Sequence, residues 1–158
     1  MTPRVKFQKA NVLRSLGRLD EADRLFEKAP DGYAVREVQA EKLLRQGKPG
    51  EAIRLLEPVL ERGIPAGDSR RAVLGCAYAA AGRREDAENL AASASLNPVI
   101  SARIFVCLGD KDRAFVALDR AVAAGPFRMG RALNGDGLSM LRGDPRLLAL
   151  RRKVGLPE

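Results

Sequence analysis

The sequence predicts an all-α protein made of stacked helical hairpins, a solenoid. Alanine, leucine and arginine dominate its 158 residues, and only 4% of them are aromatic, a composition that favours helix throughout. A module of fixed spacing also recurs four times: a glycine, a charged residue four positions later, and an alanine directly after that. Modules a few tens of residues apart are typical of solenoids, in which each unit buries its apolar face against its neighbours.

The four modules begin at Gly17, Gly47, Gly82 and Gly109, which are 30, 35 and 27 residues apart. A glycine can close the first helix of a pair with a positive φ, because it has no Cβ. Acidic residues open the second helix in three of the copies, near the positive end of its dipole. The alanine that follows marks the point where the two helices cross closely. Each module therefore predicts one helical hairpin.

The four predicted hairpins occupy residues 1–125, at about 3–32, 33–66, 67–97 and 98–125. Their expected helices run over about 4–16 and 20–29, 34–46 and 49–62, 68–81 and 84–95, and 98–108 and 111–124. Pro49 and Pro98 fall in first turns, where their missing N–H group matters little. Pro58 falls inside a helix and is expected to bend it.

The module stops at the end of the fourth hairpin, and residues 126–158 are expected to form a loop and a capping helix. Residues 127–136 have the glycine and asparagine content of a loop. Asp144 then caps a last short helix, which starts at Pro145 and is ended by Gly155. A solenoid needs such an element to cover its last apolar face. The residues expected to cover it are Leu147, Leu148, Leu150 and Val154.

The third module carries the fullest pattern, namely Leu74-Gly75, Tyr78, Gly82, Asp86-Ala87, Ala94 and Asn97-Pro98. In these residues it resembles the tetratricopeptide repeat, and the resemblance spans roughly residues 3–125. The resemblance implies a right-handed superhelix that binds other proteins and has no catalytic activity. From Gly109 to Pro157 the chain is also similar to the closing segment of tetratricopeptide arrays attached to bacterial signalling proteins. The matching runs are residues 109–115, 138–146 and 154–157.

The resemblance also implies where a partner would bind, because first helices line a concave groove in that family. The candidate contacts are first-helix residues that face away from the second helix: Arg4, Phe7, Asn11, Arg14, Glu37, Glu41, Arg45, Cys76 and Arg103. Smaller or apolar residues that share this face include Leu44, Ala72, Ala79, Ala80 and Val106. Such a groove would hold an extended peptide or a helix of a protein partner. For the third and fourth hairpins a second interpretation stays open, in which the chain's own tail covers the groove.

The net charge of +8 leaves two other functions open. Most basic residues alternate with acids, as on a solvated helical face, but the last third of the chain is richer in arginine. That third could bind nucleic acid or an anionic surface, although no aromatic residues interleave with its arginines to stack on bases. Self-association through an uncovered end repeat is the second alternative.

Catalysis, cofactors and metals are not expected. The chain has no histidine, and no serine lies at a recognisable spacing from a base. Cys76 and Cys107 are interpreted as small buried side chains. A disulfide or a redox switch is the alternative, because adjacent repeats would bring the two cysteines near each other. No apolar run reaches the roughly 20 residues that span a bilayer, and the chain is expected in the cytoplasm.

Overall fold

The structure, a computed structural model, describes residues 2–25, 33–63, 69–93, 97–125, 129–134 and 136–156. Every regular element within these ranges is a helix, which confirms the predicted fold class. In chain order the elements are α1 (Pro3–Ser15), α2 (Leu19–Arg24), α3 (Tyr33–Arg45), α4 (Pro49–Glu61), α5 (Ser69–Ala80), α6 (Arg84–Ser93), α7 (Pro98–Cys107), α8 (Lys111–Ala124), α9 (Met129–Asn134), η2 (Asp136–Leu141) and α10 (Pro145–Lys153).

The first eight helices pair into the hairpins that the modules predict, called hairpins 1 to 4 below. Their ends lie within two residues of the predicted ends wherever the structure describes them; the predicted ends at residues 29 and 95 and the predicted start at residue 68 fall outside the described residues. The helix α4 runs through Pro58 without a break. No helix in the described part of the chain is both long and apolar enough to cross a membrane.

The glycine and the alanine of each module take the roles that their spacing predicts. Gly47 and Gly82 have φ values of +71° and +76°, in the left-handed region that glycine adopts most readily, and Gly17 and Gly109 behave alike. Two backbone hydrogen bonds close the turns at Gly47, Gly82 and Gly109, for example from Gly47 N to Leu44 O at 3.0 Å and from Lys48 N to Leu43 O at 2.9 Å. At Gly17 the corresponding bond runs from Arg18 N to Leu13 O at 2.8 Å. The module alanines, which are Ala22, Ala52, Ala87 and Ala114, are all 0% exposed.

Successive hairpins stack on one another through apolar side chains. Hairpins 2, 3 and 4 share one core cluster, which includes Leu56 of α4, Leu74 of α5 and Ile104 of α7. Each of these three is no more than 1% exposed. Gly75 lets α5 and α7 approach each other closely, because a Cβ at that position would lie 2.6 Å from Ile104 Cγ1.

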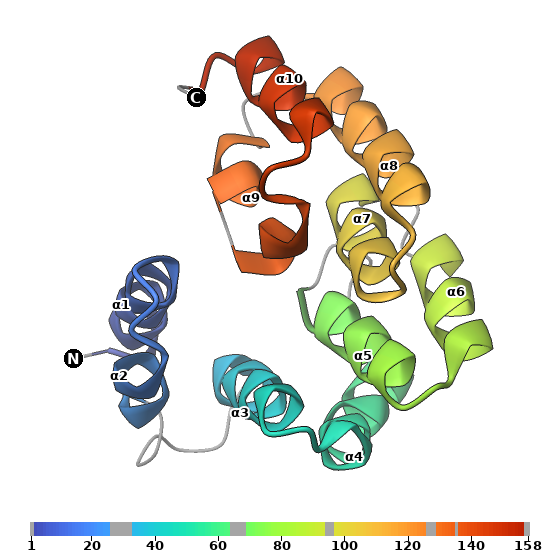
Figure 1. The fold of residues 1–158 in the computed structure, drawn as a ribbon. Helices are drawn as coiled ribbons and strands as arrows, with labels where there is room; N and C mark the ends of the chain where they lie inside the picture. The colour runs from blue at the N-terminus through green and yellow to red at the C-terminus, as the bar shows by residue number, and fades with distance from the viewer. Residues whose placement is uncertain are drawn as a thin grey trace.

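The stacked hairpins follow an arc with the first helices on its inner side (Figure 1). The helices α3, α5 and α7 face the inside of the arc, whereas α4, α6 and α8 lie outside them. The inner side lined by the first helices is called the concave face below.

The predicted loop at residues 127–136 is wrong throughout its described part, because α9 and η2 lie there. Met129 and Leu133 stand four residues apart on α9 and are 1% and 5% exposed. Leu138 and Leu141 of η2 are 2% and 0% exposed. All four join the core cluster of α7 and α8. The glycine content of this stretch concealed its apolar spacing.

The predicted capping helix is confirmed as α10. Asp144 accepts a hydrogen bond from the backbone N–H of Arg146 at 3.0 Å, which caps the helix at its N-terminus. Leu147 and Leu150 are 7% and 4% exposed and pack in the cluster of α7 and α8. Leu148 is 40% exposed, so its prediction as a covering residue is wrong. It lies on the solvent side of the helix.

The tail forms a shortened fifth hairpin, a feature that the sequence modules do not predict. Gly143 lies 34 residues after Gly109 and has a φ of +85°, like the glycines of the four module turns. It separates η2 from α10, which we call hairpin 5. In this hairpin η2 contacts α7, and α10 contacts α8. The first helix of hairpin 5 therefore packs on the first helix of hairpin 4, and the second helix packs on the second. The alanine of the module is missing, and a buried leucine, Leu147, stands where the charged residue would be.

Candidate partner-binding surface

The residues predicted to contact a partner lie on the first helices, and the structure describes the side chains of five of them. Four others, namely Arg4, Phe7, Asn11 and Arg14, lie on α1, and their side chains fall outside the described part of the structure. The described candidates are Glu37, Glu41, Arg45, Cys76 and Arg103. Each of these has a contact within the chain, so the concave face is partly occupied by the protein itself.

Glu41 and Arg103 join two first helices that are not neighbours in the stack. Glu41 Oε1 of α3 lies 3.9 Å from Arg103 Nη2 of α7, and each side chain is 22% exposed. Since α5 packs between these helices, the ion pair bridges the concave face at the level of hairpin 3. Glu37, one turn before Glu41, is 8% exposed. Neither carboxylate therefore stands free in an open groove.

Arg45 connects hairpin 2 to hairpin 1. Its Nη2 atom donates to Asp23 Oδ2 of α2 at 2.6 Å, and Asp23 is 8% exposed. A charge-assisted hydrogen bond of this length to a buried carboxylate is a strong contact. Arg45 itself keeps 33% of its side chain exposed, so it remains reachable from solvent.

Cys76 and Cys107 form a disulfide, so the interpretation as two separate buried side chains is wrong and the alternative is confirmed. The bond joins α5 to α7 across a Cα–Cα distance of 5.2 Å. The close approach at Gly75 is what brings the two helices within reach of this bond. Disulfides are rare in cytosolic proteins, and the bond therefore weighs against the cytoplasmic location that the sequence predicts.

The tail covers the concave face of hairpin 4 but leaves part of hairpin 3 open. A Cβ placed on Gly137 of η2 would lie 2.9 Å from Arg103 Cδ, so η2 lies directly on this arginine. Ala72 and Val106, two of the small groove residues, are 0% and 3% exposed. Ala80, at the end of α5, is exposed. The accessible part of the concave face thus lies toward the C-terminal ends of α3 and α5.

A shallow depression lies between α3 and α4, at residues that the sequence did not single out. Its lining residues are Gln39, Lys42, Leu43 and Gln46 of α3 and Glu51, Arg54 and Leu55 of α4. We call it the α3–α4 depression. It combines two cations, two amides and two leucines with one carboxylate, a composition suited to a peptide rather than to a purely apolar ligand.

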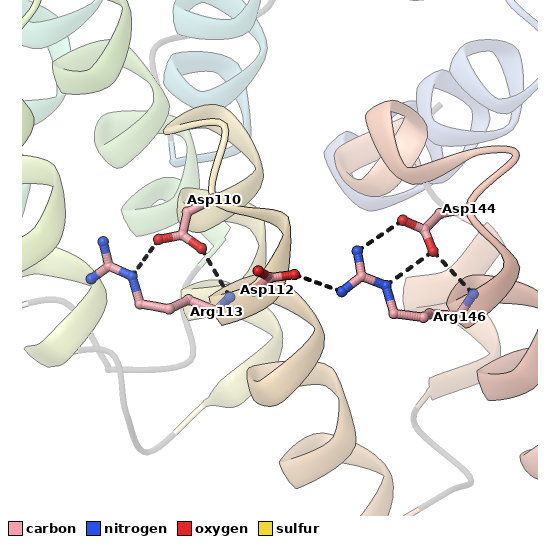
Figure 2. A network of polar contacts seen from close by, with 5 residues as sticks. All are labelled: Asp110, Asp112, Arg113, Asp144 and Arg146. Atoms are coloured by element: carbon pink, nitrogen blue, oxygen red, sulfur yellow. Dashed lines mark hydrogen bonds and ion pairs between the residues drawn. The ribbon is translucent and has the colours of Figure 1, made fainter.

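Arg146, at the start of α10, is engaged in a polar network although its side chain is 45% exposed (Figure 2). Arg146 pairs with Asp144 at 3.0 Å and with Asp112 of α8 at 2.7 Å, and its guanidinium stacks 4.1 Å from the centre of the Phe115 ring. Asp144 and Asp112 raise the pKa of Arg146, and the Arg146 guanidinium in turn lowers the pKa of Asp144.

Arg113 makes the corresponding contacts one hairpin earlier. It pairs with Asp110 at 2.6 Å and with Glu88 of α6 at 2.8 Å, and it stacks 4.6 Å from the centre of the Phe105 ring. Figure 2 shows both arginines beside the aspartates at the start of α8 and α10. Within the described residues no group of three or more potential metal ligands is found.

A comparison with protein families identifies part of this array. The model of the tetratricopeptide repeat matches residues 8–29, which include the turn of hairpin 1. The matched stretch is similar to a single tetratricopeptide repeat. Tetratricopeptide repeats are in general protein–protein interaction modules and are typically non-catalytic. No curated protein and no solved structure matches the chain.

Proposed function

We propose that this chain is a non-enzymatic adaptor that holds an extended peptide or a helix of a protein partner on its concave face. The observation that carries this proposal is the stack of antiparallel hairpins with α3, α5 and α7 on the inner side of the arc. The matched tetratricopeptide repeat supports the same class of function. The partner would lie over the accessible C-terminal ends of α3 and α5, beside Arg45 and Ala80.

Nucleic-acid binding through the basic last third has less support. Arg146 is paired with two aspartates, and Lys153 lies 3.7 Å from Asp119 of α8. Positive charges held by carboxylates of the same chain release few counterions from a phosphate backbone.

A matched pair of substitutions tests the concave face. Ala80→Glu places a charged side chain at the exposed end of α5, and Ala92→Glu makes the same change at the exposed end of α6, outside the arc. Both positions lie in the last turn of a helix, so the unfavourable effect on the helix dipole is alike. In a pull-down from extracts of the native cells, Ala80→Glu should lose proteins that the unmodified chain and Ala92→Glu both recover. Equal recovery by all three proteins would exclude binding at this part of the concave face.

A further inference from the structure

The α3–α4 depression occupies a face that other hairpins use for stacking. In the module register, Gln39, Lys42 and Leu43 of hairpin 2 correspond to Leu74, Ala77 and Tyr78 of hairpin 3, each 35 residues later. Leu74, Ala77 and Tyr78 are 1%, 0% and 7% exposed. The Tyr78 hydroxyl donates to Glu57 Oε1 of α4 at 3.0 Å. In hairpin 3 this face is therefore sealed against hairpin 2.

The same face of hairpin 2 is polar and open. A glutamine stands in place of Leu74 and a lysine in place of Ala77, and neither Gln39 nor Lys42 is buried. Hairpin 1 meets α3 through Val38, which packs with Ala10, Leu13 and Ala22, and through the pair formed by Arg45. Neither Val38 nor Arg45 lines the depression. Within the described part of hairpin 1, no residue lines the depression.

The two cations that line the depression have no acidic partner in the part of the chain that the structure describes. Among the described residues, Arg45, Arg83, Arg113 and Arg146 each pair with a carboxylate of another helix, whereas Lys42 and Arg54 pair with none. The one carboxylate in the lining, Glu51, lies 3.6 Å from Lys48 Nζ. Its charge is offset by that lysine, so the depression keeps an excess of positive charge.

We propose that the α3–α4 depression binds an acidic segment of the partner protein that carries an aliphatic side chain. Carboxylates of the segment meet Lys42 and Arg54, and the aliphatic side chain packs on Leu43 and Leu55, which are half-buried. Gln39 and Gln46 add donors and acceptors for the backbone of the segment. This inference rests on the proposed function, since it names the class of partner that the adaptor takes.

Selection from a display library of random dodecapeptides tests the inference without a known ligand. Enriched peptides should combine Asp or Glu with Leu, Ile or Met. Their affinity, measured by fluorescence polarisation, should fall at least about tenfold in the Lys42→Glu/Arg54→Glu variant, because two attractive charges become repulsive. The matched control is Arg62→Glu/Arg120→Glu, which reverses two exposed arginines outside the depression and should leave the affinity unchanged. Circular dichroism confirms that each variant is folded.

The remaining outcomes separate this inference from the proposed function. Peptides that lose affinity with Ala80→Glu but bind the Lys42→Glu/Arg54→Glu variant normally would overturn the depression as a site and support the concave face. Enriched peptides without acidic residues would also overturn it. If a mixed-sequence single-stranded oligonucleotide displaces the peptides at equal concentration, the depression is a phosphate site and the inference is wrong. A library that yields no enriched peptide overturns the inference, whereas the pull-down with Ala80→Glu still decides the proposed function.

Discussion

The N-terminal and C-terminal hairpins differ in how their second helices begin. In α2 and α4 the residue at the N-cap is Arg18 or Lys48, and neither side chain makes a capping hydrogen bond. In α8 and α10 the N-cap is Asp110 or Asp144, and each accepts a backbone N–H at 3.0 Å. At the start of α2 the basic Arg18 precedes the acidic Glu21, whereas at the start of α8 the acidic Asp110 precedes the basic Arg113. Only the order with the aspartate first satisfies a free N–H group of the helix.

The turn arginines of the hairpins also differ in what they reach. Arg18 pairs with Glu21 three residues away at 2.6 Å, an exposed pair within one turn that contributes little to stability. Arg113 and Arg146 pair locally too, but each also reaches a carboxylate of the preceding hairpin and stacks on an aromatic ring. Arg83 follows the same rule with Glu57 and Tyr78. Hairpins 3, 4 and 5 are thus tied to their predecessors by one repeated device.

The disulfide reinforces the same region, because it joins hairpin 3 to hairpin 4. The device based on a turn arginine has no counterpart at the start of α2 or α4 within the described residues. The comparison teaches that the two ends of one repeat array can carry different tasks. The C-terminal hairpins form a closed scaffold, and the open, unpaired surface lies on hairpin 2.

Removal of the disulfide is the largest test of this difference. In the chain-entropy account, a bond between cysteines 31 residues apart stabilises the fold by about 3–4 kcal/mol. The Cys76→Ala/Cys107→Ala variant should lose about this amount in urea unfolding. Hydrogen exchange should become faster in α5 and α7 and stay unchanged in α3. Reductant should destabilise the unmodified chain and leave the variant unaffected. Identical urea midpoints for the variant and the oxidised unmodified chain would show that the bond adds nothing.

Two glycines, one in each region, should respond to alanine with opposite signs. Gly75→Ala brings a Cβ to 2.6 Å from Ile104 Cγ1 in the closely packed C-terminal region, and overpacking of this kind costs about 1–3 kcal/mol. Gly50 of α4 has only the end of the Arg54 side chain near the added Cβ, at 4.0 Å. Gly50→Ala should therefore stabilise the protein by about 0.4–1 kcal/mol through the unfolded state. Thermal unfolding of the two variants measures both signs, and a shift in the same direction would refute the packing argument.

The sequence predicted the hairpins well because their signals are local. A glycine with positive φ and an alanine at a helix crossing depend on neighbours a few residues away, and α8 begins at 111 and ends at 124 as predicted. The apolar pair of Met129 and Leu133 was equally local, but the surrounding glycines and asparagine favoured a loop. Hairpin 5 was missed because it keeps the turn glycine and replaces the rest of the module.

The candidate site was less predictable because it depends on how strongly the array curves. The repeat register predicts Glu41 and Arg103 as contacts of the concave face, and the structure pairs them with each other. It could not show that the two would pair, since the distance from α3 to α7 is set by the packing of α5 between them. Lys42 and Arg54 were missed because the predicted contacts all lie on the concave face of the first helices, whereas Lys42 lies on the face that hairpin 3 uses for stacking and Arg54 lies on a second helix. The signal in the sequence was Lys42, which stands in hairpin 2 at the position that Ala77 occupies in hairpin 3.

The smallest expected effect concerns the helix caps. Asp110→Asn should lower the melting temperature by less than Gly75→Ala, because Asp110 is a surface residue, and Lys48→Gln should leave it nearly unchanged, because Lys48 caps nothing. The pKa of Asp110 is lowered by the backbone N–H of Arg113 and by its guanidinium. A carboxyl group with a lower pKa in the folded chain stabilises the fold above its ordinary pKa of about 3.9 and loses that effect as the pH falls through the lower value.

The pH dependence separates a charged cap from a loss of packing. The difference in unfolding free energy between the unmodified chain and Asp110→Asn should be full at neutral pH and vanish in strong acid, where the aspartic acid is also uncharged. Lys48→Gln provides the baseline from the N-terminal region, since its difference from the unmodified chain should stay flat over the same range. Urea unfolding at a series of pH values from 7 downward measures both curves. If the difference in unfolding free energy persisted in acid, Asp110 would stabilise the fold through its packing rather than through its charge. A charged N-cap would then not explain how the C-terminal hairpins differ from the N-terminal ones.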